Sequence, residues 1–507
     1  MKFYEIDNAI QEAIAAADKP VRVKIDINHS GHFESVFEQD IIEANFYGLK
    51  EAAGGTSARG ELLLDNPQGI YSISNAAGRE VRISFSLGEG LPYFQRFIFY
   101  IDDKGIQDIR GAGRKRQVLI NLRDLSAKLR KTDEARDWTS PVVYVYSVVC
   151  DKTQAEKSLV HGIASRAGIF SNDIDCSTIP VTLPYVRLRR NVWAELSSLA
   201  TAYRCHLECP VEKPLVFAHS VYQSEPLTDN EYSHTFRGED IFYFRKVEKA
   251  DYYRNTVRLK INMPVSLEKQ EIWHYDEPPV FYDEFLQPHY PFKYPLVREI
   301  ETTKYEAKYR VIDADGKERN VVFADEIDTQ DEAENRLDYD SNAQLTMNSE
   351  QCLSYSLFDV TSKYDRAIVT LQKDYDVDLY NAAIYGRPIV LDINRSCFLR
   401  DVDGIAAYGT AALNVTGSYF SEYEINGIQQ YEDWVMRELA ERIQSKNEFT
   451  VKTHRALFNA RVGAKIKIKT RNEETAGTIN AFSFRYNREK AFIASFKIQE
   501  QLGGNEK

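Results

Sequence analysis

The sequence lacks any uncharged apolar run long enough to cross a membrane. Its longest such run, PVVYVYSVVC at residues 141–150, is about half of the roughly 20 residues that a membrane-spanning helix needs. The first residues, MKFYEIDNAI, also lack the basic-then-apolar order of a secretory signal. We therefore expect a protein without a membrane span and without Sec-dependent export.

The sequence has few cysteines, and they are scattered. Only Cys205 and Cys209 lie close together, and no second pair of cysteine or histidine ligands follows at zinc-finger spacing. The spread does not fit a disulfide-rich scaffold, and the alternation around this pair is typical of a strand with one buried face. We expect reduced, buried thiols and no metal ligand. The six cysteines are Cys150, Cys176, Cys205, Cys209, Cys352 and Cys397.

Basic residues are fewer than acidic ones. The chain has 64 Lys and Arg against 76 Asp and Glu, which gives a formal net charge of −12. A protein that binds nucleic acid regardless of sequence needs a basic surface, so the balance disfavours that class. A length of 507 residues indicates roughly three or four folding units.

The short motifs of common enzymes are missing from the sequence. It contains no G-x-x-x-x-G-K-[ST], no G-x-S-x-G and no H-E-x-x-H. Residues 110–113 (RGAG) do not complete a dinucleotide-binding fingerprint, and residues 162–165 (GIAS) carry alanine where the nucleophile would stand. We therefore predict no catalytic residue, no cofactor-binding residue and no cofactor.

Aromatic residues are abundant, but of two kinds only. The chain has 31 Tyr and 26 Phe against 4 Trp and 4 Met. Tyr and Phe are enriched in strands and in the contact surfaces of proteins. The surplus predicts β structure, and we interpret it as assembly surface.

The patterning predicts an α+β, predominantly antiparallel β, multidomain protein. Apolar and polar residues alternate at 21–27 and at several later stretches, as in half-buried strands. Asp315-Gly316 predicts a hairpin between strands at 305–312 and 319–323. We expect four segments: an N-terminal β-barrel-like domain with a leading helix at 1–120, an α/β domain at 121–240, a second β domain at 241–400, and a C-terminal α/β domain with a long helix and closing strands at 401–507.

Residues 275–295 are dense in Pro, Tyr and Phe (YDEPPVFYDEFLQPHYPFKYP). Five prolines exclude a regular inner strand, so the segment is either an extended arm on a neighbouring protein or a long loop. Acidic residues beside aromatic ones also suit a glycan-hydrolysing site, with Asp276, Glu277, Asp283 and Glu284 as its candidates. We favour a protein-binding arm. The predicted interface residues are Tyr275, Phe281, Tyr282, Phe285, Tyr290, Phe292 and Tyr294.

Three stretches, taken in order, resemble bacteriophage and prophage tail-tip proteins of the baseplate hub or tail-associated family. Residues 56–102 carry a small-residue loop, a strand, Leu-Asp-Asn, a turn with Gly, Tyr-Ser and later Phe-x-Phe-Tyr-Ile-Asp. Residues 158–217 carry Ile-Ala-x-x-Ala-Gly-Ile and then Leu-x-x-Leu-Ala-x-Ala. Finally, a helix at 426–443 precedes the strand VGAKIKI at 462–468.

The resemblance implies a structural virion protein with tail-tube-like β-barrel domains. Such hub proteins form a trimer that presents a pseudo-sixfold ring, caps the tail tube and holds the tip or spike. The implied partners are tail-tube, distal tail and tip or spike proteins, with genomic DNA passing through without specific binding and with no membrane contact. The implied location is the virion tail, assembled in the cytoplasm of the bacterial host.

Two other functions compete with this hypothesis. One is a tail-borne protein that binds or degrades polysaccharide or cell wall. The other is a non-viral surface or carbohydrate-binding protein, which the missing export signal disfavours. We expect no enzyme activity, with weak glycan hydrolysis as the open alternative.

Overall fold

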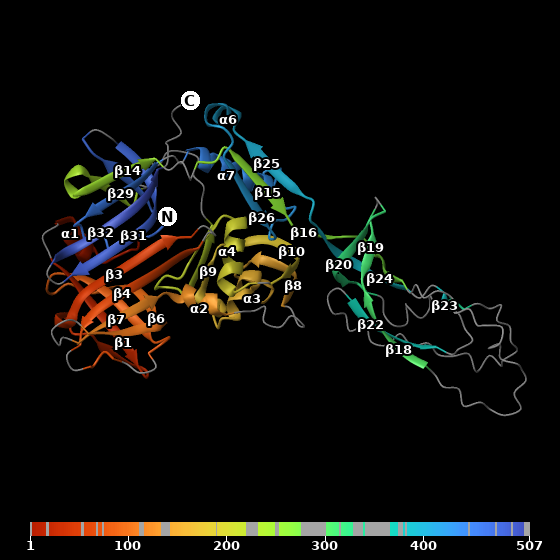
Figure 1. Cartoon of the computed structure of the whole chain (residues 1–507), viewed down its shortest axis with the longest axis horizontal. Helices are drawn as coiled ribbons and strands as arrows, with labels where there is room; N and C mark the ends of the chain where they lie inside the picture. Colours follow the sequence, from red (N-terminus) through yellow and green to blue (C-terminus); the bar gives the residue numbers. More distant parts are fainter. Residues whose placement is uncertain are drawn as a thin grey trace, which may run out of the picture. The chain divides into compact units, whose positions relative to one another are not determined.

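The computed structural model describes most of the chain and divides it into two compact units (Figure 1). The first consists of Met1–Thr182, Arg187–Lys260 and Ser396–Lys507, and the second of Leu183–Val186 and Ile261–Arg395. The described residues are 3–16, 20–51, 55–66, 69–72, 76–110, 116–132, 142–188, 190–219, 232–248, 253–274, 301–313, 316–327, 338–339, 366–373, 379–380, 383–444, 447–471, 474–487 and 490–500.

The first unit is built on a large, mostly antiparallel sheet. Its N-terminal half follows helix α1 (Asn8–Ala16), and most of its strands alternate buried and partly exposed side chains, as a sheet with one face on the core requires. The strands of this half are β1 (Val21–His29), β2 (His32–Ser35), β3 (Ile41–Lys50), β4 (Thr56–Asp65), β5 (Glu80–Leu87), β6 (Phe94–Arg110) and β7 (Arg116–Arg123).

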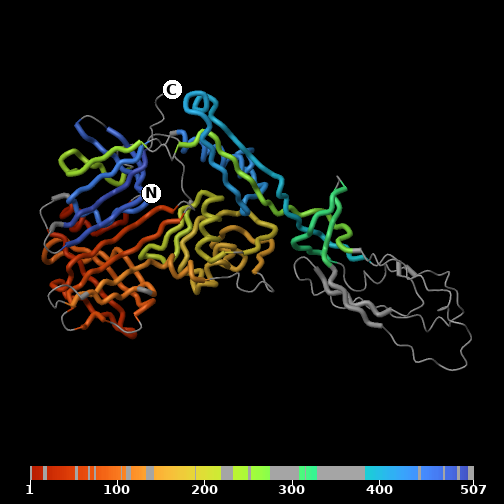
Figure 2. Tube along the Cα trace, in the orientation of Figure 1, coloured from red at the N-terminus to blue at the C-terminus, as the bar shows by residue number. Residues whose placement is uncertain are grey.

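Strands from the end of the chain complete the same sheet. Figure 2 shows the C-terminal segment beside the N-terminal one, and β3 pairs antiparallel with β31, Phe46 opposite Phe484. The order is β14-β29-β32-β31-β3-β4-β7-β6-β5-β1-β2, with β30 on β31 and β13 parallel to β30. The added strands are β13 (His234–Arg237), β14 (Tyr243–Glu248), β29 (Asn447–Thr453), β30 (Lys465–Lys469), β31 (Glu474–Asn487) and β32 (Lys490–Glu500).

This sheet differs from the expected arrangement in two ways. Strands that we expected in separate N-terminal and C-terminal domains share one sheet and one hydrophobic core. Among the described strands the path is open, with ends at β14 and β2, so it is not a closed barrel. Whether the four expected segments fold independently stays a prediction.

A cluster of phenylalanines fills the core. Phe85 on β5 stacks on Phe458 with ring centroids 5.3 Å apart and contacts Phe484 edge-on at 6.3 Å. Phe46 contacts Phe85, Phe97 and Phe99. These contacts join strands far apart in the sheet order, so the sheet curls over its own core. Much of the phenylalanine surplus is therefore core here, and its interpretation as assembly surface does not hold for these residues.

A smaller α/β part follows β7 in the chain. Asp124 caps helix α2 (Leu125–Lys131), and Asn191 caps the expected helix α4 (Val192–Ala202), each by accepting a backbone N–H bond. The remaining elements are β8 (Val143–Cys150), α3 (Leu159–Ser165), β9 (Ile174–Cys176), β10 (Ile179–Arg187), β11 (Cys205–Glu208) and β12 (Leu215–His219).

A three-stranded sheet and the long C-terminal helix complete the first unit. The sheet has the order β25-β15-β26, and helix α7 buries Trp434 and Val435. The helix expected at residues 426–443 corresponds to α7. The elements are β15 (Thr256–Ile261), β25 (Ser396–Arg400), α6 (Val402–Tyr408), β26 (Ala412–Gly417), β27 (Glu424–Ile425), β28 (Ile428–Gln429) and α7 (Gln430–Gln444).

The second unit is a set of small sheets with its own core around Tyr309, Val321 and Ile384. The expected Asp-Gly hairpin is confirmed, since β19 and β20 pair antiparallel and Gly316 has φ 74°, which favours glycine. The strands are β16 (Met263–Ser266), β17 (Gln270–His274), β18 (Glu301–Lys308), β19 (Arg310–Ile312), β20 (Glu318–Asp325), β21 (Asp338–Tyr339), β22 (Arg366–Lys373), β23 (Leu379–Tyr380) and β24 (Ala383–Asp392).

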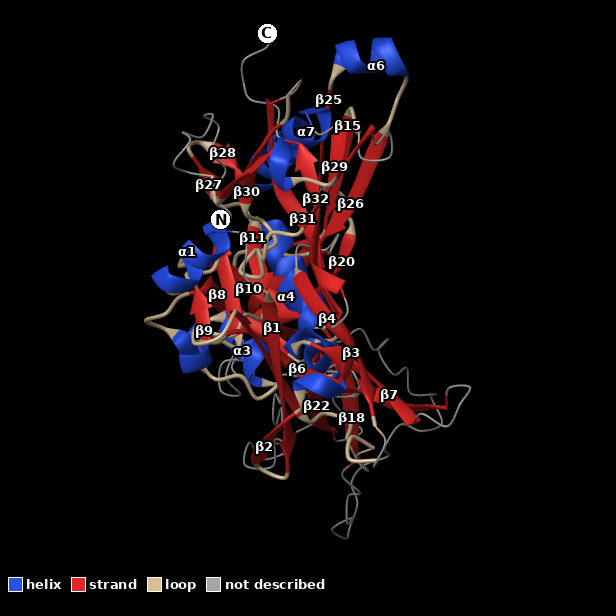
Figure 3. Cartoon of the chain, turned by 90° about the vertical axis from the view of Figure 1, so that its left-hand side faces the viewer, coloured by secondary structure: helices blue, strands red, loops and turns tan. Residues whose placement is uncertain are grey.

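The fold class predicted from the sequence is confirmed. Strands dominate the secondary structure (Figure 3), and most pairings are antiparallel, with β9–β12 and β13–β30 as parallel exceptions. In the part of the chain that the structure describes, no helix is both long and apolar enough to span a bilayer.

Candidate assembly site

The interface residues predicted from the sequence lie outside the described residues. This applies to Tyr275, Phe281, Tyr282, Phe285, Tyr290, Phe292 and Tyr294. The four acids of the glycan-hydrolase alternative, Asp276, Glu277, Asp283 and Glu284, lie in the same undescribed segment. Both interpretations therefore stay predictions, and the candidate site is built from other residues.

Two edge strands, β14 and β2, lie at the two ends of the main strand path of the large sheet, each beside exposed aromatic rings, and β13 is a further edge on the side branch through β30. At the β2 end, Phe33 and Phe37 are 36% and 59% exposed. At the β14 end, Phe242 and Tyr243 are 51% and 39% exposed. An edge strand offers unpaired backbone N–H and C=O groups to another chain, and exposed aromatic rings are typical anchors of protein interfaces. Each end of the sheet thus combines both features of an assembly surface.

Neighbouring side chains hold two of these rings in place. The Arg82 guanidinium on β5 lies over the Phe33 ring, 3.9 Å from its centroid. At the other end, the Phe242 ring stacks on His454 with centroids 4.3 Å apart. A ring that is already held loses less conformational freedom when a partner covers it. Both ends are therefore pre-organised for contact.

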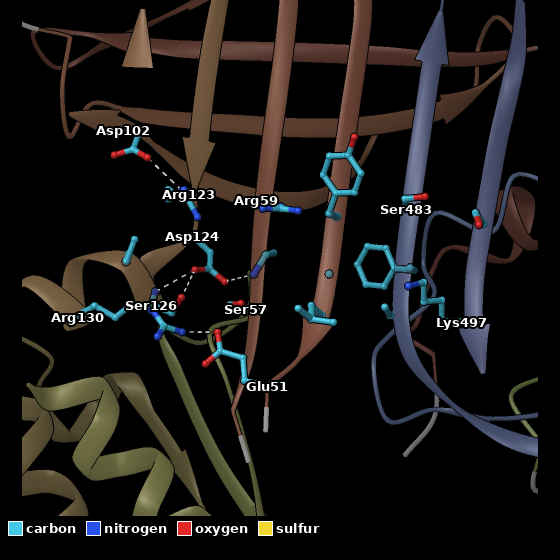
Figure 4. Close-up of a pocket in the computed structure, with 18 of the residues that line it drawn as sticks. Glu51, Ser57, Arg59, Asp102, Arg123, Asp124, Ser126, Arg130, Ser483 and Lys497 are labelled. Carbon is cyan, nitrogen blue, oxygen red and sulfur yellow. Dashed lines mark hydrogen bonds and ion pairs between the residues drawn. The ribbon is translucent and has the colours of Figure 1, made fainter. Parts of the chain in front are cut away.

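Between the two ends lies a groove of about 690 Å³ on the face of the sheet (Figure 4). Residues that line the groove lie directly opposite one another, in one row, on five neighbouring strands, which belong to both halves of the sheet. Arg123 on β7 lies opposite Arg59 on β4, Arg59 opposite Tyr47 on β3, Tyr47 opposite Ser483 on β31, and Ser483 opposite Ser495 on β32. The row explains how strands from both ends of the chain build one surface.

Helix α2 and the residues that flank the sheet close one side of the groove with paired charges. Arg123 pairs with Asp102 at 3.1 Å, and Arg130 pairs with Glu51. Trp193 also donates to Glu51 at 3.0 Å. Burial alone would raise the pKa of Glu51, but hydrogen bonds from Arg130, Ser57 and Trp193 bring it below its usual value. Glu51 is therefore an anion at neutral pH.

Asp124 lies buried at the start of α2 and lines the same groove. It accepts hydrogen bonds from the backbone N–H groups of Ala58 and Ser126. Burial outweighs these bonds and raises its pKa to about 6. The groove therefore combines apolar side chains with hydroxyl groups, paired charges and one carboxyl group that titrates in mildly acidic solution.

Neither the sheet ends nor the groove is predicted from the sequence. The short strand β2 after a tight turn is a weak sign of a sheet edge. The groove has no local sign, because its residues come from strands that pair across hundreds of positions.

No protein-family model matches the chain, and no curated protein matches its sequence. Among solved structures, it is similar to a tail protein from Neisseria meningitidis MC58, with a TM-score of 0.47, 8% identity and 94% and 97% of the two chains covered. The 43 kDa tail protein of prophage MuSo2 from Shewanella oneidensis gives a TM-score of 0.47, 8% identity and coverage of 94% and 98%.

A third similar structure is a prophage tail protein from Listeria monocytogenes EGD-e, with a TM-score of 0.41, 8% identity and 94% of each chain covered. All three of these solved structures are named as tail proteins.

Proposed function

We propose that this protein is a structural component of a phage or prophage tail tip, where it forms the baseplate hub. It acts by assembly rather than by catalysis. Three copies associate into a ring that caps the tail tube, and the ring organises the tip or spike on its other face. The sequence resemblance supports this function, and one structural observation carries it: both ends of the main strand path of the large sheet, β14 and β2, lie beside exposed aromatic rings.

Head-to-tail contact between unlike edges is the geometry that builds rings. A surface that meets a different surface of the next copy makes a heterologous contact, which closes into a ring when the rotation allows. The β14 end of one copy would meet the β2 end of the next. Such a contact repeats between chains the strand pairing that β3 and β31 make within one chain.

The two halves of the sheet support the pseudo-sixfold arrangement. Each chain contributes an N-terminal half with β1–β7 and a C-terminal half with β29–β32. Three chains would then supply six half-sheets around the ring. The formal net charge of −12 suits a passage through which DNA moves without being held. The partners in this proposal are tail-tube, distal tail and tip proteins, the location is the virion tail, and assembly takes place in the host cytoplasm.

The experiment measures the oligomeric state of the whole chain. Sedimentation velocity gives the mass of the particle, and negative-stain imaging gives its symmetry. We expect a trimer and a threefold ring with a central opening. Replacing Phe37 and Phe242 by serine removes one exposed ring from each end, so the double variant should dissociate at concentrations at which the wild type stays trimeric.

Phe170→Ser is the matched control, because Phe170 is 66% exposed and lies on neither edge strand. This variant should form the same ring as the wild type. A wild-type chain that stays monomeric at every concentration tested would overturn the trimer. Equal trimers for the double variant and the wild type would show that the edges do not form the contact.

A further inference from the structure

Two cysteines and a histidine that the sequence separates meet inside the first unit. Cys150 is the last residue of β8, His161 lies on α3, and Cys176 is the last residue of β9. One donor atom from each, two sulfurs and a ring nitrogen, lie within 4.8 Å of one another. All three side chains are buried. The fold thus gathers three metal-binding side chains at one buried point.

These donors are the kind that zinc and related ions prefer. Thiolate and imidazole are the usual ligands of protein-bound zinc, with bonds of about 2.0–2.3 Å. Ligand atoms around a tetrahedral ion therefore lie about 3.3–3.8 Å apart. The observed limit of 4.8 Å exceeds this by about 1 Å, which small side-chain rotations can close.

Ser158 orients the histidine. Its hydroxyl oxygen lies 2.7 Å from His161 Nδ1, and both residues are buried. A hydrogen bond to one ring nitrogen commonly fixes the orientation of a metal-ligating histidine. Ser158 also hydrogen-bonds to Cys150. The serine therefore joins two of the three candidate ligands and limits the freedom that metal binding would have to remove.

We propose that Cys150, His161 and Cys176 bind one transition-metal ion of the zinc type. The ion would tie the ends of β8 and β9 to helix α3, with a water molecule completing four-coordination. Its role would be structural, because it would link three elements of the small α/β part. The sequence predicts no metal site here, because these ligands come from three separate elements and do not show the close spacing of a zinc finger.

The first experiment uses the full chain and zinc itself. Protein purified from zinc-supplied medium without chelators is analysed by inductively coupled plasma mass spectrometry. We expect about one zinc per chain for the wild type and less than a tenth of that for Cys150→Ser and Cys176→Ser. Cys209→Ser is the control, because this cysteine lies outside the cluster, and it should keep the wild-type stoichiometry.

The second experiment needs no variant. Cobalt added to metal-free wild-type protein should produce a thiolate-to-cobalt charge-transfer absorption that one equivalent saturates. A protein that binds neither zinc nor cobalt would overturn the proposal. So would a mass lower by two hydrogens that dithiothreitol restores, because it would show a Cys150–Cys176 disulfide. Metal that stays stoichiometric in both serine variants would place the ion elsewhere and also overturn it.

Discussion

Arg96 on β6 donates a hydrogen bond from Nε to the backbone carbonyl of Phe458, 2.9 Å away. It donates a second bond from Nη2 to the carbonyl of Ala460 at 2.8 Å. The Arg96 side chain is buried, and its guanidinium also lies over the Tyr4 ring at 4.4 Å. This arginine therefore fastens the N-terminal half of the sheet to the loop between β29 and β30.

Replacing Arg96 by methionine should lower the free energy of unfolding by about 2–4 kcal/mol. The change removes two charge-assisted hydrogen bonds and leaves two buried carbonyl groups without these donors, and such losses cost about 1–3 kcal/mol each. Thermal unfolding followed by circular dichroism checks this. The control is Arg82→Met, which removes a partly exposed arginine on neighbouring β5. Equal melting temperatures for Arg96→Met and wild type would contradict the role of Arg96.

The close approach of β3 and β31 predicts an effect at Gly48. This glycine lies opposite Phe482, and a β-carbon placed on it would overlap the Phe482 ring. Gly48→Ala should destabilise the protein by about 1–3 kcal/mol, as overpacking usually does. Phe482→Ala removes the ring, so in that background the same Gly48 change should cost less than about 0.5 kcal/mol. Thermal unfolding of the four proteins gives this double-mutant cycle, and strictly additive effects would contradict the overlap.

The raised pKa of Asp124 predicts that the free energy of unfolding decreases as pH rises. Burial raises its pKa from 3.8 to about 6, so the folded protein keeps a proton that the unfolded chain releases above about pH 4. The free energy of unfolding should therefore fall as pH rises from about 4 to about 6, by up to about 3 kcal/mol from this group. Asp124→Asn removes the titration.

Melting temperatures of the wild type and Asp124→Asn, measured from pH 4 to pH 7, check this dependence. As pH rises, the melting temperature of Asp124→Asn should increase relative to that of the wild type. A constant difference across this range would show that Asp124 is fully ionised in the folded protein and would contradict the raised pKa.

Glu195 on α4 predicts a ranking of two variants. Its buried carboxylate accepts hydrogen bonds from Tyr419, from the Arg190 backbone N–H at 2.8 Å and from the Arg190 guanidinium at 3.0 Å. Glu195→Gln should cost about 2–4 kcal/mol, because it removes the charge of a buried carboxylate that accepts several hydrogen bonds and pairs with the half-exposed Arg190 guanidinium. Tyr419→Phe removes one hydrogen bond and should cost about 1–3 kcal/mol. Chemical denaturation measures the free energy of unfolding of both variants. A larger decrease for Tyr419→Phe than for Glu195→Gln would contradict the central role of the carboxylate.

Local features of the fold follow from the sequence, and distant pairings do not. The alternation VRVKIDI predicts β1, and Asp315-Gly316 predicts the hairpin between β19 and β20, because each signal lies within the element that it specifies. The pairing of Phe46 with Phe484 has no such signal. By its sequence alone, any of several buried strands could pair with the free edge of β3. Tertiary packing selects β31 as the partner.

The same limit applies to the candidate sites. The sequence draws attention to Tyr275 and its neighbours because prolines and aromatic residues are dense there. Exposed Phe37 and Phe242 stand out only when the strand order shows that each lies beside a sheet edge. Residue type alone could not separate these rings from Phe85, which is equally aromatic and fully buried.

The position of β31 next to β3 also has a consequence for synthesis of the chain. The ribosome completes residue 43 long before residue 487, its pairing partner. Until then the edge of β3 lacks its neighbour, and an unpaired strand edge on an incomplete core is a template for aggregation. Folding of the large sheet therefore cannot finish before β31 has been synthesised, and a chain truncated before residue 447 would leave this edge of β3 unpaired.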